Sequence, residues 1–151
     1  METVSGSGCA TTKKNENVIR ALVVDDSPVE RMVNGSILNK LLKTERYQEA
    51  VDGNEAVNLH KTPAGQGIKH KLFDLILMDS HMPNMNDIQY IINLLGNKNL
   101  REMGISSIII GVSREENTAQ RFKEAGANSY VQKPLSAGKL KPILEEFKLI
   151  Y

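Results

Sequence analysis

The stretch Phe73–Asp79, FDLILMD, decides the fold because it is a nearly continuous apolar run that ends in a carboxylate. A short run of this kind is typical of a strand in the middle of a parallel sheet, where both faces are covered. The run Ile105–Val112 has the same character and is followed by Ser113. These two runs predict an α/β fold with buried parallel strands at its centre.

Three weaker strand patterns lie on either side of these runs, and helical patterns separate all five. The weaker strands are predicted at Val18–Val24, Tyr47–Val51 and Ser129–Val131. The helices are predicted from Pro28, after a turn at Asp52-Gly53-Asn54, around Ile88–Leu95, over Glu115–Ala125 and around Leu140–Ile150. With right-handed crossovers, five βα units predict a five-stranded doubly wound parallel sheet of the flavodoxin-like type, with strand order 2-1-3-4-5.

Local signals indicate where the helices begin and end. Ser27 is suited to cap the free amides of the first helix, Pro28 suits the first helical position, and Glu30 completes a capping box. Gly126 predicts the end of the Glu115–Ala125 helix. Pro142 either kinks the last helix or marks its start.

The first helix has one apolar face and one unfavourable residue. Its apolar positions recur every four residues: Val29, Val33, Ile37 and Leu41. They predict a single apolar face on this helix. Gly35 lies in the helix interior, where it costs about 1 kcal/mol against Ala.

Composition limits the class of protein. The 151 residues are 40% apolar and 25% charged, which suits one globular domain over 18–151, and residues 1–17 are polar enough to predict a flexible tail. A net charge of +1 argues against a dedicated nucleic-acid binder. Cys9 is the only cysteine, so an intramolecular disulfide and a four-cysteine zinc site are excluded. Without a signal segment or an apolar run long enough for a bilayer, a cytoplasmic protein is expected, which could also enter the nucleus.

Polar side chains follow four of the predicted strands: Asp25, Asp26, Asp79, Ser113 and Lys133. The carboxyl ends of parallel strands meet at one edge, where open α/β sheets bind ligands. Crowded carboxylates repel one another unless a cation lies between them, and oxygen ligands suit Mg²⁺. The pattern indicates phosphoryl transfer in which Asp79 attacks phosphorus, Lys133 and Mg²⁺ neutralise the phosphoryl oxygens, and Ser113 hydrogen-bonds the product.

Each of these residues also has an ordinary interpretation when it is taken alone. Asp79 can form a turn, the pair Asp25-Asp26 can be solvated, Ser113 can cap the next helix, and Lys133 can be a surface lysine. Their coincidence at four strand ends favours chemistry over these separate roles.

Five motifs occur in an order and spacing that point to a known family. They are ALVVDDSP from Ala21, DGNEA from Asp52, FDLILMDSHMP from Phe73, IIIGVS from Ile108 and YVQKPL from Tyr130. Together they resemble the receiver domain of two-component response regulators over about residues 18–150. The residues within these motifs are most similar to those of plant receivers, particularly the type-C response regulators, which are stand-alone receiver domains. The resemblance therefore implies a place in a plant phosphorelay such as cytokinin signalling.

The resemblance implies a role for each matching residue of the acidic site. Asp79 corresponds to the phosphoacceptor, and Asp25 and Asp26 to the acidic pair that holds Mg²⁺. The backbone carbonyl of His81 corresponds to a further metal ligand.

The resemblance also implies a switch, and the sequence departs from the family pattern at two positions. Ser113 corresponds to the switch hydroxyl and Tyr130 to the switch aromatic. Lys133 corresponds to the lysine that pairs with the phosphoryl group, and the Lys133-Pro134 bond to the cis peptide of the family. Asp87 stands where most receivers have Gly, and Arg114 where a small residue is usual.

The resemblance further implies a monomeric receiver that accepts phosphate from a histidine-containing phosphotransfer protein, with a hybrid histidine kinase upstream. Such partners commonly dock on the first helix. The sequence ends at Tyr151, just after the last predicted helix, so no output domain is expected and the protein would act as a phosphate drain or a competitor. Its own catalysis would be Mg²⁺-dependent self-phosphorylation and slow aspartyl-phosphate hydrolysis at most. The alternatives are a phosphorylation-independent interaction module with a receiver fold and a metal-dependent phosphate-ester hydrolase.

Overall fold

The computed structural model describes residues 19–42, 47–61, 72–79, 107–114 and 116–150. In chain order they form β2 (Ala21–Val24), α2 (Pro28–Leu42), β3 (Gln48–Ala50), α3 (Gly53–His60), β4 (Leu75–Asp79), β5 (Ile108–Ser113), α6 (Glu116–Ala125), β6 (Ser129–Gln132) and α7 (Ala137–Glu146). The predicted tail 1–17 and the predicted helix around Ile88–Leu95 lie outside the described residues.

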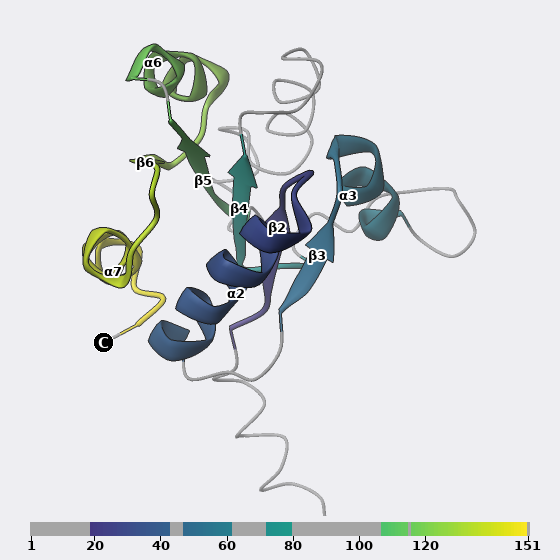
Figure 1. Cartoon of the computed structure of the whole chain (residues 1–151), viewed down its shortest axis with the longest axis horizontal. Coiled ribbons are helices and arrows are strands. Elements are labelled where there is room, and N and C mark those ends of the chain that lie inside the picture. Colours follow the sequence, from purple (N-terminus) through teal and green to yellow (C-terminus); the bar gives the residue numbers. More distant parts are fainter. Residues whose placement is uncertain (1–18, 43–46, 62–71, 80–106, 115, 151) are drawn as a thin grey trace, which may run out of the picture.

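The five strands form one parallel sheet in the order β3-β2-β4-β5-β6, with β4 in the middle (Figure 1). This is the predicted order 2-1-3-4-5, so the doubly wound fold is confirmed. The register pairs Asp79 of β4 with Val112 of β5, and Ser113 of β5 with Gln132 of β6. The carboxyl ends of these central strands therefore lie at one edge of the sheet.

Alternate residues of the buried strands supply two separate cores, one on each face of the sheet. On β4, Ile76 and Met78 pack in one core with Phe122 of α6, and Leu75 and Leu77 pack in the other. The second core also contains Leu38 of α2 with Leu140 and Leu144 of α7, and α2 and α7 lie side by side over it (Figure 1). Because both faces of the strands are covered, their apolar runs are continuous.

The apolar face predicted for the first helix is only partly buried. Val29 is 63% exposed and Val33 is 47% exposed, whereas Leu38 is fully buried. Val29 and Val33 line a groove of about 570 Å³, so the beginning of the apolar face is exposed. Gly35 is buried because the Tyr47 ring lies where a Cβ would be, with Tyr47 Cζ only 1.9 Å from that point.

The helix ends follow the sequence signals in most places. Gly126 has φ 110° and follows α6 directly, as predicted. Pro142 lies inside α7, which begins after Ser136, so it does not mark the start of that helix. The strand β2 begins at Ala21, later than predicted, because the Arg20 N–H donates to the Asp74 carboxylate at 2.9 Å. None of the helices described is long and apolar enough to cross a bilayer.

Candidate functional site

The polar residues predicted at the strand ends lie at one edge of the sheet, and all of them except Ser113 line a single cavity there. Asp25 follows β2, Asp79 ends β4, Ser113 ends β5 and Lys133 follows β6. A cavity of about 370 Å³ opens at this edge. Its described lining residues are Asp25, Asp26, Ser27, Glu30, Asp79, Arg114 and Lys133. The strand topology therefore builds one strongly charged site.

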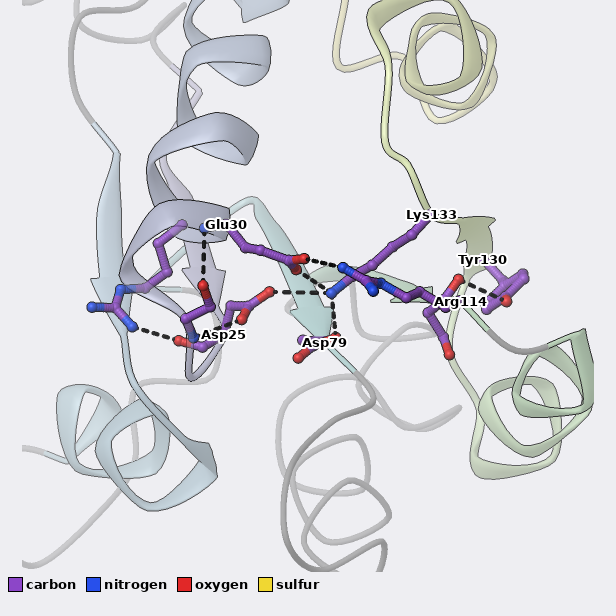
Figure 2. A network of polar contacts seen from close by, with 9 residues as sticks. Asp25, Glu30, Asp79, Arg114, Tyr130 and Lys133 are labelled. Atoms are coloured by element: carbon purple, nitrogen blue, oxygen red, sulfur yellow. Dashed lines mark hydrogen bonds and ion pairs between the residues drawn. The ribbon is translucent and has the colours of Figure 1, made fainter.

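Lys133 lies between three carboxylates (Figure 2). Its Nζ is 2.9 Å from Asp79 Oδ1 and 3.6 Å from Asp25 Oδ2, and it donates a hydrogen bond to Glu30. The side chains of Lys133, Asp25 and Asp79 are only 8%, 1% and 2% exposed. Since water is largely excluded, these charges interact more strongly than they would at the surface.

Glu30 is the member of this cluster that sequence reasoning missed. Ser27 Oγ accepts a hydrogen bond from the Glu30 N–H at 3.3 Å, which is half of the predicted capping box. The other half is absent, because the Ser27 N–H donates to Asp25 Oδ1 at 2.9 Å. The Glu30 carboxylate reaches across the cavity instead, to Lys133 and to Arg114, whose Nη2 is 3.3 Å from Oε1.

The ionisation of these groups reflects their burial and their mutual charge. Burial raises the pKa of Asp25 from 3.8 to about 6, and the negative charge of Asp79 raises it further. The hydrogen bond from the Ser27 N–H and the positive charge of Lys133 lower this pKa but do not outweigh the rise. The hydrogen bond from Lys133 lowers the pKa of Glu30. Burial alone would lower the pKa of Lys133, but its bonds to Glu30 and Asp79 outweigh that effect and raise the pKa.

The residues present fit a divalent cation. Asp25 Oδ2 is buried and accepts no hydrogen bond from the described residues. Oxygen atoms of Asp25, Glu30 and Asp79 all lie within 4.8 Å of one another. A buried carboxylate oxygen that accepts no hydrogen bond and lies close to other carboxylates is suited to a hard cation such as Mg²⁺. Asp26 is exposed and borders the same cavity.

Two residues of the sequence prediction cannot be placed. His81, whose carbonyl was expected to ligate the metal, and Asp87 lie outside the described residues.

The two residues assigned to a switch are joined by a hydrogen bond from the Tyr130 side chain to the Ser113 backbone. Ser113 is buried, and its carbonyl oxygen accepts hydrogen bonds from the Tyr130 hydroxyl at 3.2 Å and from the Lys133 N–H at 2.7 Å. The Tyr130 ring packs against Phe122 with a centroid distance of 6.1 Å. The Lys133-Pro134 peptide is cis, as the resemblance implied.

Comparison with known proteins identifies the family. Residues 21–145 match the family model of the response regulator receiver domain. The chain belongs to this family. Among curated relatives, this receiver is 40% identical to Two-component response regulator 24 of Arabidopsis thaliana over 134 residues, which cover 87% of this chain and 85% of that protein. It is 35% identical to Two-component response regulator ARR22 of the same plant over 150 residues, covering 95% and 96%. The predicted resemblance to plant response regulators is confirmed.

Solved receiver structures share the fold at lower identity. The D1050A mutant of the receiver domain of the histidine kinase CKI1 from Arabidopsis thaliana has a TM-score of 0.66 and 24% identity, covering 95% of this chain and 99% of that chain. A co-crystal structure of the yeast phosphotransfer protein Ypd1 with the receiver domain of Ssk1 gives 0.61 and 23%, covering 85% and 87%. Both likenesses support the topology of the sheet.

Proposed function

We propose that this receiver accepts a phosphoryl group on Asp79 from a histidine-containing phosphotransfer protein. The observation that carries the proposal is the position of Asp79. Its carboxylate is buried at the end of the central strand and lies 2.9 Å from the buried ammonium of Lys133. A carboxylate held beside a fixed cation, in a cavity open to solvent, can attack phosphorus while the cation neutralises the phosphoryl oxygens.

The transfer balances without a further reactant. The P–N bond of the phosphohistidine breaks, a bond forms between phosphorus and an Asp79 oxygen, and the imidazole leaves with the electron pair. Lys133 would bind an oxygen of the transferred group, and the Ser113 hydroxyl would hydrogen-bond another. The place of Ser113 at the end of β5, directly after Val112, the register partner of Asp79, supports this role. Water that later attacks phosphorus would return the carboxylate.

Asp25, Asp26 and Asp79, together with the carbonyl of His81, are the residues proposed to hold Mg²⁺. When bound, the ion supplies positive charge that offsets the carboxylates and the phosphoryl oxygens. Asp25 Oδ2, which accepts no hydrogen bond from the described residues, supports its part in the set.

The proposed docking surface for the partner is the start of α2. Val29, Met32 and Val33 are exposed there, and a groove leads from the valines to Lys133. Apolar side chains exposed beside a reaction site are typical of a protein-binding surface. The relation of the fold to the Ssk1 receiver, solved together with Ypd1, supports a phosphotransfer partner. The two Arabidopsis relatives are matched over most of their own length, which supports a function exerted by the receiver domain itself, as a drain of phosphate or as a competitor.

Intact mass after incubation with acetyl phosphate and Mg²⁺ tests the acceptor. Wild type should gain one phosphoryl group, and Asp79→Asn should gain none. Asp52→Asn is the matched control, because Asp52 caps α3 and does not line the cavity, and Asn is an equally good cap. Phosphate gain by Asp79→Asn at the wild-type rate would refute the assignment.

A second experiment separates a drain from a competitor. Wild type and Asp79→Asn are each mixed with a phosphorylated histidine phosphotransfer protein in Mg²⁺, and phosphohistidine is followed over time. Only wild type should speed its loss. Equal decay in both mixtures, with equal binding, would leave the interaction-module function.

A further inference from the structure

Glu30 bridges two cations of very different exposure (Figure 2). One carboxylate oxygen accepts a hydrogen bond from Lys133 Nζ, and the other lies 3.3 Å from Arg114 Nη2. The Lys133 side chain is 8% exposed and that of Arg114 is 69% exposed. The same carboxylate is thus held between a cation inside the site and a cation at its rim.

Lys133 cannot keep all its present contacts when a phosphoryl group is on Asp79. An ammonium has three N–H donors, and here its neighbours are the carboxylates of Asp25, Asp79 and Glu30. A phosphoryl group brings negative oxygens that need the same cation, and a carboxylate on that cation repels them.

Glu30 is the neighbour best able to leave. Asp25 and Asp79 are 1% and 2% exposed and are fixed at strand ends, whereas the Glu30 side chain is 27% exposed on the first turn of α2. It can turn away without moving the sheet, and Arg114 is already in contact with its second oxygen.

We propose that Glu30 binds Lys133 in the unphosphorylated protein and so competes with an incoming phosphoryl group. When a phosphoryl group is on Asp79, Glu30 leaves Lys133 and its carboxylate pairs with Arg114 alone. The inference rests on the proposed function of Asp79. Glu30 and Arg114 are positioning residues in this scheme, since both act through Lys133. The Glu30 exchange makes and breaks no covalent bond: with acetyl phosphate, the bond between phosphorus and the acetyl oxygen breaks, the Asp79–phosphorus bond forms, and acetate leaves.

The test is a cycle of variants measured by the initial rate of phosphate gain from acetyl phosphate in Mg²⁺. Glu30→Gln keeps the shape and the backbone cap but removes the competing charge, so it should react about tenfold faster than wild type. Arg114→Ala leaves Glu30 on Lys133 and should react about fivefold slower. The double variant should match Glu30→Gln, because Arg114 then has no carboxylate to hold. Arg114→Lys should restore most of the wild-type rate.

Several outcomes would overturn the inference. An equal slowing by Arg114→Ala in both backgrounds would show that Arg114 acts on the donor directly. A wild-type rate for Glu30→Gln would show that Glu30 does not compete with the phosphoryl group. Beryllofluoride, a phosphoryl analogue, gives a second readout, and its affinity should follow the same order across wild type and the four variants. If neither wild type nor Glu30→Gln gains phosphate, the proposed function of Asp79 is refuted instead of the role of Glu30.

Discussion

Lys133→Met would remove the positive charge from the middle of a buried group of carboxylates while keeping a side chain of similar length. Asp25 and Asp79 are 1% and 2% exposed, and Lys133 Nζ is 3.6 and 2.9 Å from them. Removing one partner of a buried ion pair costs about 3–5 kcal/mol, because the remaining charge is left uncompensated. We expect about 3 kcal/mol, the lower end, because Asp25 has a pKa of about 6 and can take up a proton.

This loss can be measured without any phosphotransfer assay. For a domain of this size, a change of 3 kcal/mol corresponds to a fall of about 9 °C in Tm. Urea unfolding followed by circular dichroism suits the chain, which has no Trp. The measurement is made in a chelator and again in Mg²⁺, which should recover more stability in Lys133→Met than in wild type, because a cation then faces one more uncompensated carboxylate.

Lys141→Met is the matched control, since Lys141 is exposed on α7. It should change the free energy of unfolding by less than about 0.5 kcal/mol. If Lys133→Met is as stable as the control in chelator, the three carboxylates do not depend on Lys133 for their charge balance and the reasoning is refuted.

Three further changes test separate features. Because the Asp25 pKa rises from 3.8 to about 6 on folding, the stability of metal-free wild type relative to Asp25→Asn should fall as pH rises from about 4 to 7 in urea titrations; a constant difference would contradict that pKa. Asp26 is exposed, so Asp26→Ala should leave the metal-free Tm nearly unchanged yet abolish Mg²⁺ binding in calorimetry, and an unchanged affinity would remove Asp26 from the ligand set. Gly35→Ala should destabilise by about 1 kcal/mol because Tyr47 occupies the space of the new Cβ, but should stabilise by a similar amount in a Tyr47→Ala background, and chemical denaturation that shows the same sign in both would exclude this contact.

The strands and their order were predictable because their signal is local. A buried parallel strand is a short apolar run, and the residue that ends it is placed at the sheet edge by the topology alone. Asp79, Ser113 and Lys133 could therefore be assigned to one site before any contact was known. Strand ends differed by a few residues where a side chain intervened, as at Arg20.

The features that escaped prediction depend on contacts between residues distant in sequence. Glu30 and Lys133 are 103 residues apart, and Glu30 and Arg114 are 84 apart. Within the helix signal, Glu30 had a sufficient local explanation as a capping residue. Nothing in the sequence around Glu30 indicates that its carboxylate contacts Lys133, which follows a different strand. Gly35 likewise looked unfavourable for a helix, since nothing local indicates that Tyr47 will lie against it.

The site thus combines two kinds of residue with different freedom to change. The register of β4 on β5 and of β5 on β6 fixes Asp79, Ser113 and Lys133, and a slip of one residue would turn every side chain of a strand to the other face. Glu30 lies in the first turn of α2 and Arg114 directly follows β5, and they meet at the rim of the cavity. Substitutions there leave both cores untouched, so they can alter how readily Lys133 is released without altering the fold. In this receiver, the rate of phosphate uptake is therefore expected to be set at the rim, and the identity of the acceptor by the sheet.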